Sequence, residues 1–121
     1  MKQILKEGLC YFLITCIVFT CCGCRNYYKV DSITLVESAT TTVELPDEIV
    51  QDMVSIWGDL NWKRGYTKTA YDYTFQLDSG VLLRYVSDLG LFQDYDNNRR
   101  AYVSEEQRLS INAMIEQQFA Q

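Results

Sequence analysis

The positions of hydrophobic and polar residues divide this chain into segments with two different periods. Between 71 and 77 the two kinds alternate strictly, which is typical of a half-buried β-strand. Turn residues follow at 78–80. If Leu77 pairs with Val81 across this turn, the apolar side chains share one face, and Phe75 lies opposite Leu83. The aromatic residues of this predicted hairpin are expected in the core: Tyr71, Tyr73, Phe75 and Tyr85.

Two other segments repeat their apolar residues at steps of three and four, which predicts amphipathic helices. The first helix is expected to begin at Pro46, with Asp47 and Glu48 in its first turn, because acidic side chains favour the positive end of the helix dipole. The second follows Ser104, which forms a capping-box pattern with Gln107. The apolar stripes are Ile49, Met53, Ile56, Trp57 and Leu60 in the first helix, and Ile111, Met114, Ile115 and Phe119 in the second.

Short apolar or β-branched segments supply the remaining strands, and residues 61–65 are expected to form a loop. These strands are expected at 32–36, 40–45, 91–95 and 99–103. The resulting order is ββ-α-ββββ-α. Strands joined by tight turns run antiparallel, so we expect a single α+β domain over 32–121: a small antiparallel meander sheet with two helices on one face.

The first 24 residues have a different character. Lys2 and Lys6 precede a 14-residue apolar stretch, which ends at Gly23 and Cys24. These are features of a secretory signal, and the stretch is shorter than the about 20 apolar residues of a membrane-spanning helix. The segment resembles the signal peptide of a bacterial lipoprotein precursor. That resemblance implies a signal peptide over 1–23, a lipid on Cys24, and a lipidated N-terminus with a short tether over 24–31.

All five cysteines lie in this segment, so the residues after Cys24 cannot form an internal disulfide. Two alternatives remain for the segment. Cys21 and Cys24 have the spacing of a metal-binding pair, but no second pair of cysteines completes four ligands. The apolar stretch could instead stay uncleaved as a membrane anchor.

Composition narrows the range of functions. The 121 residues include 11 Lys+Arg and 16 Asp+Glu, giving a formal net charge of −5, and no histidine. Because nucleic-acid binders normally have a basic face, no nucleic-acid partner is expected. The absence of histidine excludes Ser-His-Asp and Cys-His catalysis and histidine-ligated zinc. We expect no cofactor.

The acidic residues suggest two kinds of chemistry. Asp94, Asp96, Asn98 and Glu105 match oxygen-ligand positions of a calcium loop, although Arg99 stands where that loop requires glycine. A polar hairpin tip is the alternative interpretation, and no metal site is expected. Paired carboxylates could also cleave glycosidic bonds. The candidates are expected on the solvent face of a strand or in turns, where water solvates them: Asp72, Asp78, Asp88, Asp94 and Asp96.

Aromatic and basic side chains gather after the first helix, and such side chains are frequent anchors of binding surfaces. The expected binding residues are Trp62, Lys63, Arg64 and Tyr66. The alternative is that Trp62 folds back on the helix and belongs to the core.

Together these observations predict a non-enzymatic binding or accessory module of the cell envelope, lipid-anchored at the extracytoplasmic face of the cell membrane. Its expected partners are the membrane, through the lipid, and an envelope protein or polymer. The alternative function is a small carboxylate-dependent hydrolase acting on cell-envelope polymers. A pocket with two inward-facing acids would favour the hydrolase, and a flat surface with Trp62 exposed would favour the binding module.

Overall fold

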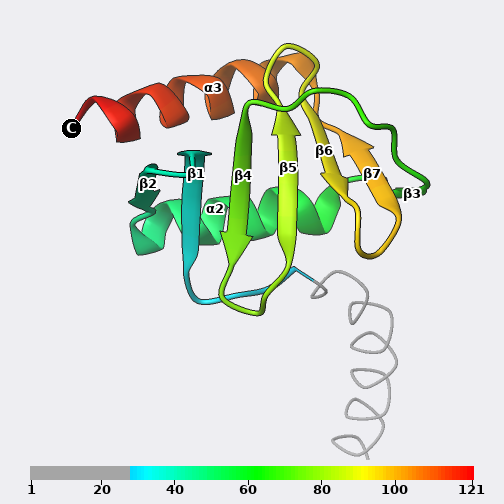
Figure 1. Ribbon diagram of the computed structural model, residues 1–121, viewed down its shortest axis with the longest axis horizontal. Helices are drawn as coiled ribbons and strands as arrows, with labels where there is room; N and C mark the ends of the chain where they lie inside the picture. The colour runs from blue at the N-terminus through cyan, green and yellow to red at the C-terminus, as the bar shows by residue number, and fades with distance from the viewer. Residues whose placement is uncertain (1–27) are drawn as a thin grey trace, which may run out of the picture.

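The computed structural model describes residues 28–121. They form a domain built of one seven-stranded antiparallel sheet and two helices (Figure 1). The predicted signal peptide and the predicted lipid site at Cys24 lie outside these residues. The strands are β1 (Ile33–Ser38), β2 (Thr41–Glu44), β3 (Lys63–Arg64), β4 (Tyr73–Leu77), β5 (Leu82–Val86), β6 (Leu91–Asp94) and β7 (Arg99–Tyr102). The helices are α2 (Asp47–Asp59) and α3 (Glu105–Ala120).

The strands lie in the order β2-β1-β4-β5-β6-β7-β3. β4 to β7 form the predicted meander, and the chain crosses from the β1–β2 hairpin to β4 through α2 and β3. The β4–β5 register confirms the prediction, since Phe75 lies opposite Leu83. The prediction of a loop at residues 61–65 is wrong for residues 63–64, because they form β3 and pair with β7 at the edge of the sheet. Two residues are too few to show a period of two.

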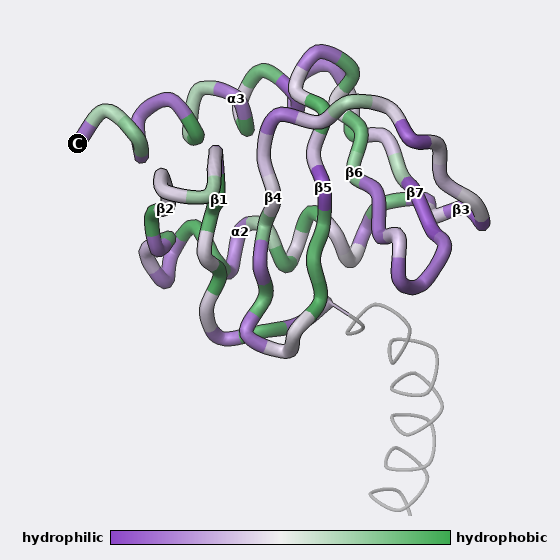
Figure 2. The backbone as a smooth tube through the Cα atoms, in the orientation of Figure 1, coloured by the Kyte–Doolittle hydropathy of each residue, from purple (hydrophilic) through white to green (hydrophobic). Residues whose placement is uncertain are grey.

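Both helices cover the same face of the sheet, as expected (Figure 1). Trp57 of α2 is fully buried at the centre of this core, where its ring meets those of Phe75 and Phe92 edge-on at centroid distances of 5.6 and 5.7 Å. Figure 2 shows apolar residues along β1, β5 and α2. The buried residues of α2 are Val50, Met53 and Trp57, so the stripe includes Val50, which was not predicted, while the predicted Ile49 is only half-buried.

The ends of the elements follow local rules. Ser104 and Gln107 form the predicted capping box at the start of α3: the Gln107 backbone N–H donates to the Ser104 hydroxyl, and the Gln107 side chain accepts from the Ser104 N–H. Pro46 occupies the N-cap position directly before α2, so the helix begins at Asp47, one residue later than expected. Gly80 has a φ of 98°, which its turn requires and which glycine adopts without strain.

The burial of three residues differs from the predictions. Tyr28 and Val30 are buried, with exposed fractions of 2% and 6%, so these two residues of the predicted tether belong to the core. Tyr71 was expected in the core but precedes β4 and is 44% exposed. Within 28–121, neither helix combines the length and the apolar character that a membrane crossing requires.

Candidate functional site: a basic edge of the sheet

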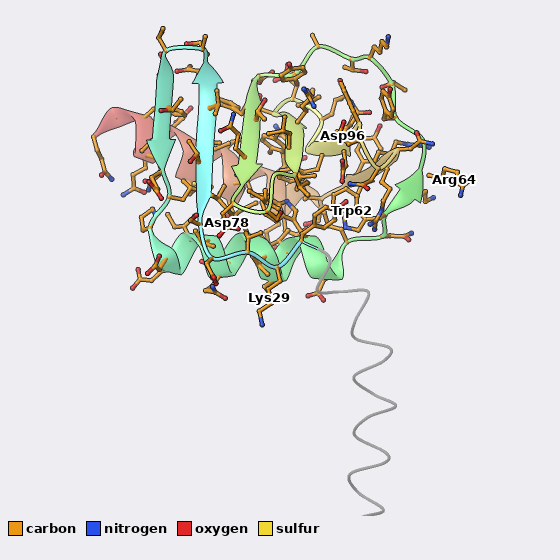
Figure 3. The ribbon with its side chains drawn as sticks, turned by 60° about the horizontal axis from the view of Figure 1, so that its bottom comes forward. Lys29, Trp62, Arg64, Asp78 and Asp96 are labelled. Atoms are coloured by element: carbon orange, nitrogen blue, oxygen red, sulfur yellow. The ribbon has the colours of Figure 1, made fainter. Side chains whose placement is uncertain are left out.

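Trp62 is held against the end of α2. Its indole Nε1–H donates to the backbone oxygen of Trp57 at 2.8 Å, and its ring centroid lies 4.7 Å from that of Tyr28. The side chain is half-buried and packs against the core. This is the folded-back arrangement, in which Trp62 fastens the start of β3 to the domain. Figure 3 shows Trp62 over the C-terminal part of α2, whereas Arg64 points away from the sheet.

Lys63 and Arg64 are exposed on β3, and the sheet brings two further cations beside them. Lys63 lies opposite Arg100 of β7, and Arg64 lies opposite Arg99. We call these four residues the basic edge. They are half of the eight basic residues in 28–121, a segment that also contains fifteen acidic residues. A strongly acidic domain therefore concentrates its positive charge on two paired strands.

Specific contacts orient the two arginines of the basic edge. Arg100 Nη1 donates to the backbone oxygen of Arg64 at 2.8 Å. The Arg99 guanidinium carbon lies 5.3 Å from the ring centroid of Tyr28 and 5.1 Å from that of Trp62, within cation–π range. These contacts offset part of the repulsion between neighbouring like charges on the paired strands. Arg99 and Arg100 are thus held by contacts within the domain, whereas the side chains of Lys63 and Arg64 are exposed.

A shallow hollow of about 300 Å³ lies on the basic edge. It is lined by Asn61, Lys63, Arg100, Ala101 and Tyr102, and the Tyr102 side chain is 58% exposed. Two cations and an accessible aromatic ring suit an anionic group such as a phosphate or carboxylate that carries an organic portion. The hollow is open, so the surface fits an extended or multivalent partner better than an enclosed small molecule.

Tyr66, the fourth predicted binding residue, belongs to a different surface. Its ring stacks on that of Tyr95 at a centroid distance of 4.4 Å. The Arg84 guanidinium carbon also lies 4.4 Å from the centroid of the Tyr95 ring. The adjoining backbone N–H of Thr67 donates to the buried Gln93 side chain at 2.7 Å. These contacts attach the segment after β3 to the sheet face opposite the helices.

The structure therefore keeps Lys63 and Arg64 together, places Trp62 behind them as a support, and separates Tyr66. Sequence reasoning missed Arg99 and Arg100. Their adjacency after the turn at 95–98 was visible, but nothing in the sequence indicates that this pair lies beside β3.

Asp94 corrects the expectation that it is a solvated acid, because its side chain is fully buried. Oδ2 accepts hydrogen bonds from the Tyr28 hydroxyl at 3.0 Å and from Asn97 Nδ2 at 2.8 Å, and Oδ1 accepts from the Asn97 N–H at 3.2 Å. The carboxylate thus closes the β6–β7 turn, in which Asn98 has the left-handed φ of 57°. Among residues 28–121, no three acidic or cysteine side chains gather as a metal site would require.

A second, polar hollow of about 240 Å³ bears on the hydrolase alternative. It is lined by Tyr73, Ser87, Asp88, Asn112 and Glu116. Asp88 and Glu116 are both exposed, and a general acid needs dry surroundings to raise its pKa. The two carboxylates of this hollow are thus open to solvent, whereas the hydrolase alternative requires an enclosed, desolvated cleft.

Comparison with known proteins finds no family model, no curated protein and no solved structure that matches the chain.

Proposed function

We propose that this protein is a non-enzymatic binding module of the cell envelope, held at the membrane by a lipid on Cys24, and that the basic edge is its binding surface for an anionic partner. The observation that carries the proposal is the pairing of Lys63 and Arg64 with Arg100 and Arg99 in a domain whose other charges are mostly negative. Such a concentration of like charge on two strands costs stability, so a role in recognition accounts for it better than folding does.

The distribution of charge across the sheet supports this proposal. The basic edge lies at the β3 end of the strand order, and β2 forms the other end. Glu44 on β2 and Glu37 on the neighbouring β1 are both exposed. The domain therefore presents opposite charges at its two edges, and an anionic partner is attracted to one edge and repelled by the other.

Chromatography of the full chain tests the binding surface. Although the sequence pI is about 4.6, the basic edge should retain the protein on a sulfonate cation-exchange resin at pH 7 and low salt. Lys63→Gln/Arg64→Gln removes two positive charges from the edge and should abolish retention. Thr42→Glu/Gln117→Glu changes the net charge equally at exposed positions on β2 and α3, and should leave retention nearly unchanged.

Equal elution of the two double variants would show that net charge, and not the basic edge, governs binding.

The anchor has its own test. Cys24→Ala should leave an unprocessed precursor without label from radioactive palmitate, and label that persists in this variant would contradict the lipid site.

A further inference from the structure

We infer that the partner of the basic edge is the layer of negatively charged phospholipid headgroups in the membrane that holds the chain's own anchor. This inference rests on the proposed lipid at Cys24. It goes further by stating which surface of the domain faces the membrane and which lipid chemistry that surface recognises.

The short distance between the anchor and the domain is the first argument. Only three residues separate Cys24 from Tyr28, so their Cα atoms are at most about 14 Å apart even when the chain is fully extended. Tyr28 is 2% exposed and already part of the core. The part of the domain that surrounds Tyr28 must therefore lie close to the headgroups.

The position of Tyr28 is the second argument. Its ring lies beside Trp62 and beneath the Arg99 guanidinium, and its hydroxyl donates to Asp94 of β6. Lys63 and Arg64 follow Trp62 directly in the chain. The end of the tether is thus fixed at the basic edge. The β2 edge lies six strand spacings away, about 29 Å across the sheet.

Charge is the third argument. Lys29 is exposed next to the fixed Tyr28, so it adds a further positive charge close to the proposed anchor. Figure 3 shows Lys29 pointing away from the domain on the side where α2 lies. Asp59 and Asp96 are exposed near the same edge and oppose the attraction. Basic side chains next to an anionic leaflet each favour the bound state by about fivefold, and salt weakens this attraction.

Two labelling positions distinguish the surface that faces the membrane from the one that faces away. Asn61 is exposed at the basic edge, and Thr42 is exposed on β2. In the processed chain Cys24 is the only natural cysteine and its thiol carries the lipid, so a fluorophore attaches only to an introduced Asn61→Cys or Thr42→Cys thiol. The labelled lipidated chain is reconstituted into vesicles of phosphatidylcholine with about one third phosphatidylglycerol, plus a lipid whose spin-labelled headgroup quenches the fluorophore.

We expect strong quenching at position 61 and weak quenching at position 42. Adding Lys63→Gln/Arg64→Gln should lower the ratio of docked to undocked chains about 30-fold, so that the two positions are quenched to similar extents. Vesicles of phosphatidylcholine alone should have the same effect. Gln117→Glu combined with Ala113→Glu changes two exposed positions on α3. This control lowers the net charge by the same amount as Lys63→Gln/Arg64→Gln, and it should preserve the stronger quenching at position 61 than at position 42.

The outcomes separate this inference from the proposed function. If the chain carries palmitate and its edge variant loses retention on the resin, but positions 61 and 42 are quenched equally in anionic vesicles, the basic edge binds another anionic partner and the membrane-facing orientation is wrong. Quenching at 61 that is the same in neutral and anionic vesicles also overturns it. Absence of palmitate on Cys24 overturns the anchor and the orientation together.

Discussion

The hydroxyl of Tyr28 donates a hydrogen bond of 3.0 Å to the carboxylate of Asp94, 66 positions later in the chain, and both side chains are buried. This contact joins the first described residue to the end of β6, where Asp94 lies opposite Arg99 of the basic edge. It therefore holds Tyr28 beside the strand pair that carries Arg99.

Tyr28→Phe removes this hydrogen bond while keeping the ring. Asp94 then retains only the donors of Asn97, and a hydrogen bond to a buried charged group contributes about 2 kcal/mol. We expect a loss of this size in the free energy of unfolding, measured by urea denaturation, and a melting temperature lower by roughly 10 °C. Tyr102→Phe removes a hydroxyl from an exposed ring and should change stability little. Equal stability of the two variants would contradict the role given to Tyr28.

Trp62→Ala should weaken the fold as well as the proposed binding surface. The substitution removes the hydrogen bond to Trp57 and the packing against Tyr28, and for a half-buried tryptophan we expect a cost of about 2–3 kcal/mol. Lys63→Gln/Arg64→Gln should leave the free energy of unfolding within about 0.5 kcal/mol, because both side chains are exposed. Retained stability in Trp62→Ala would show that the indole does not support β3.

Calcium should not stabilise the domain. In a calcium loop Asp94 would supply the first ligand, but both of its carboxylate oxygens already accept hydrogen bonds from Tyr28 and Asn97. We expect the melting temperature to be the same with millimolar calcium and with a chelator. A rise of several degrees would show selective binding to the folded state and would reverse this interpretation.

Alkaline pH should destabilise the protein through Tyr85. Burial, the largest effect, raises the pKa of Tyr85 from 10.0 to about 12, and the charge of Arg108 opposes this shift. In the unfolded chain the phenol ionises near pH 10, so its contribution to stability is fully present below pH 10 and is lost as the pH rises to about 12. The loss should be about 2 kcal/mol, measured by urea unfolding between pH 9 and 12.

Tyr85→Phe provides the comparison for this pH dependence. The variant lacks the phenol that donates to Asn112 Oδ1 at 2.7 Å, so its stability should fall less steeply over the same interval. Tyr73 remains in both proteins, and burial also raises its pKa. Identical pH profiles for the two proteins would mean that Tyr85 ionises in the folded state as readily as in the unfolded chain.

Features that depend on near neighbours were determined by the sequence itself. The hairpin of β4 and β5 has the predicted register, because a tight turn at Gly80 allows few pairings and only one of them buries Phe75 with Leu83. The capping box of Ser104 and Gln107 is equally local, since its hydrogen bonds span three residues. The α+β class followed from the same short-range patterns.

Contacts between distant residues were decided only by the tertiary structure. Asp94 ends β6 directly before a polar turn, and its buried carboxylate accepts a hydrogen bond from the hydroxyl of the distant Tyr28. β3 exists because the backbone of Lys63 and Arg64 finds hydrogen-bonding partners on the open edge of β7, and two residues carry no periodic signal of their own. The basic edge arises from this pairing: Arg100 reaches the Arg64 backbone from 36 positions away, a proximity that strand order creates and that composition cannot reveal.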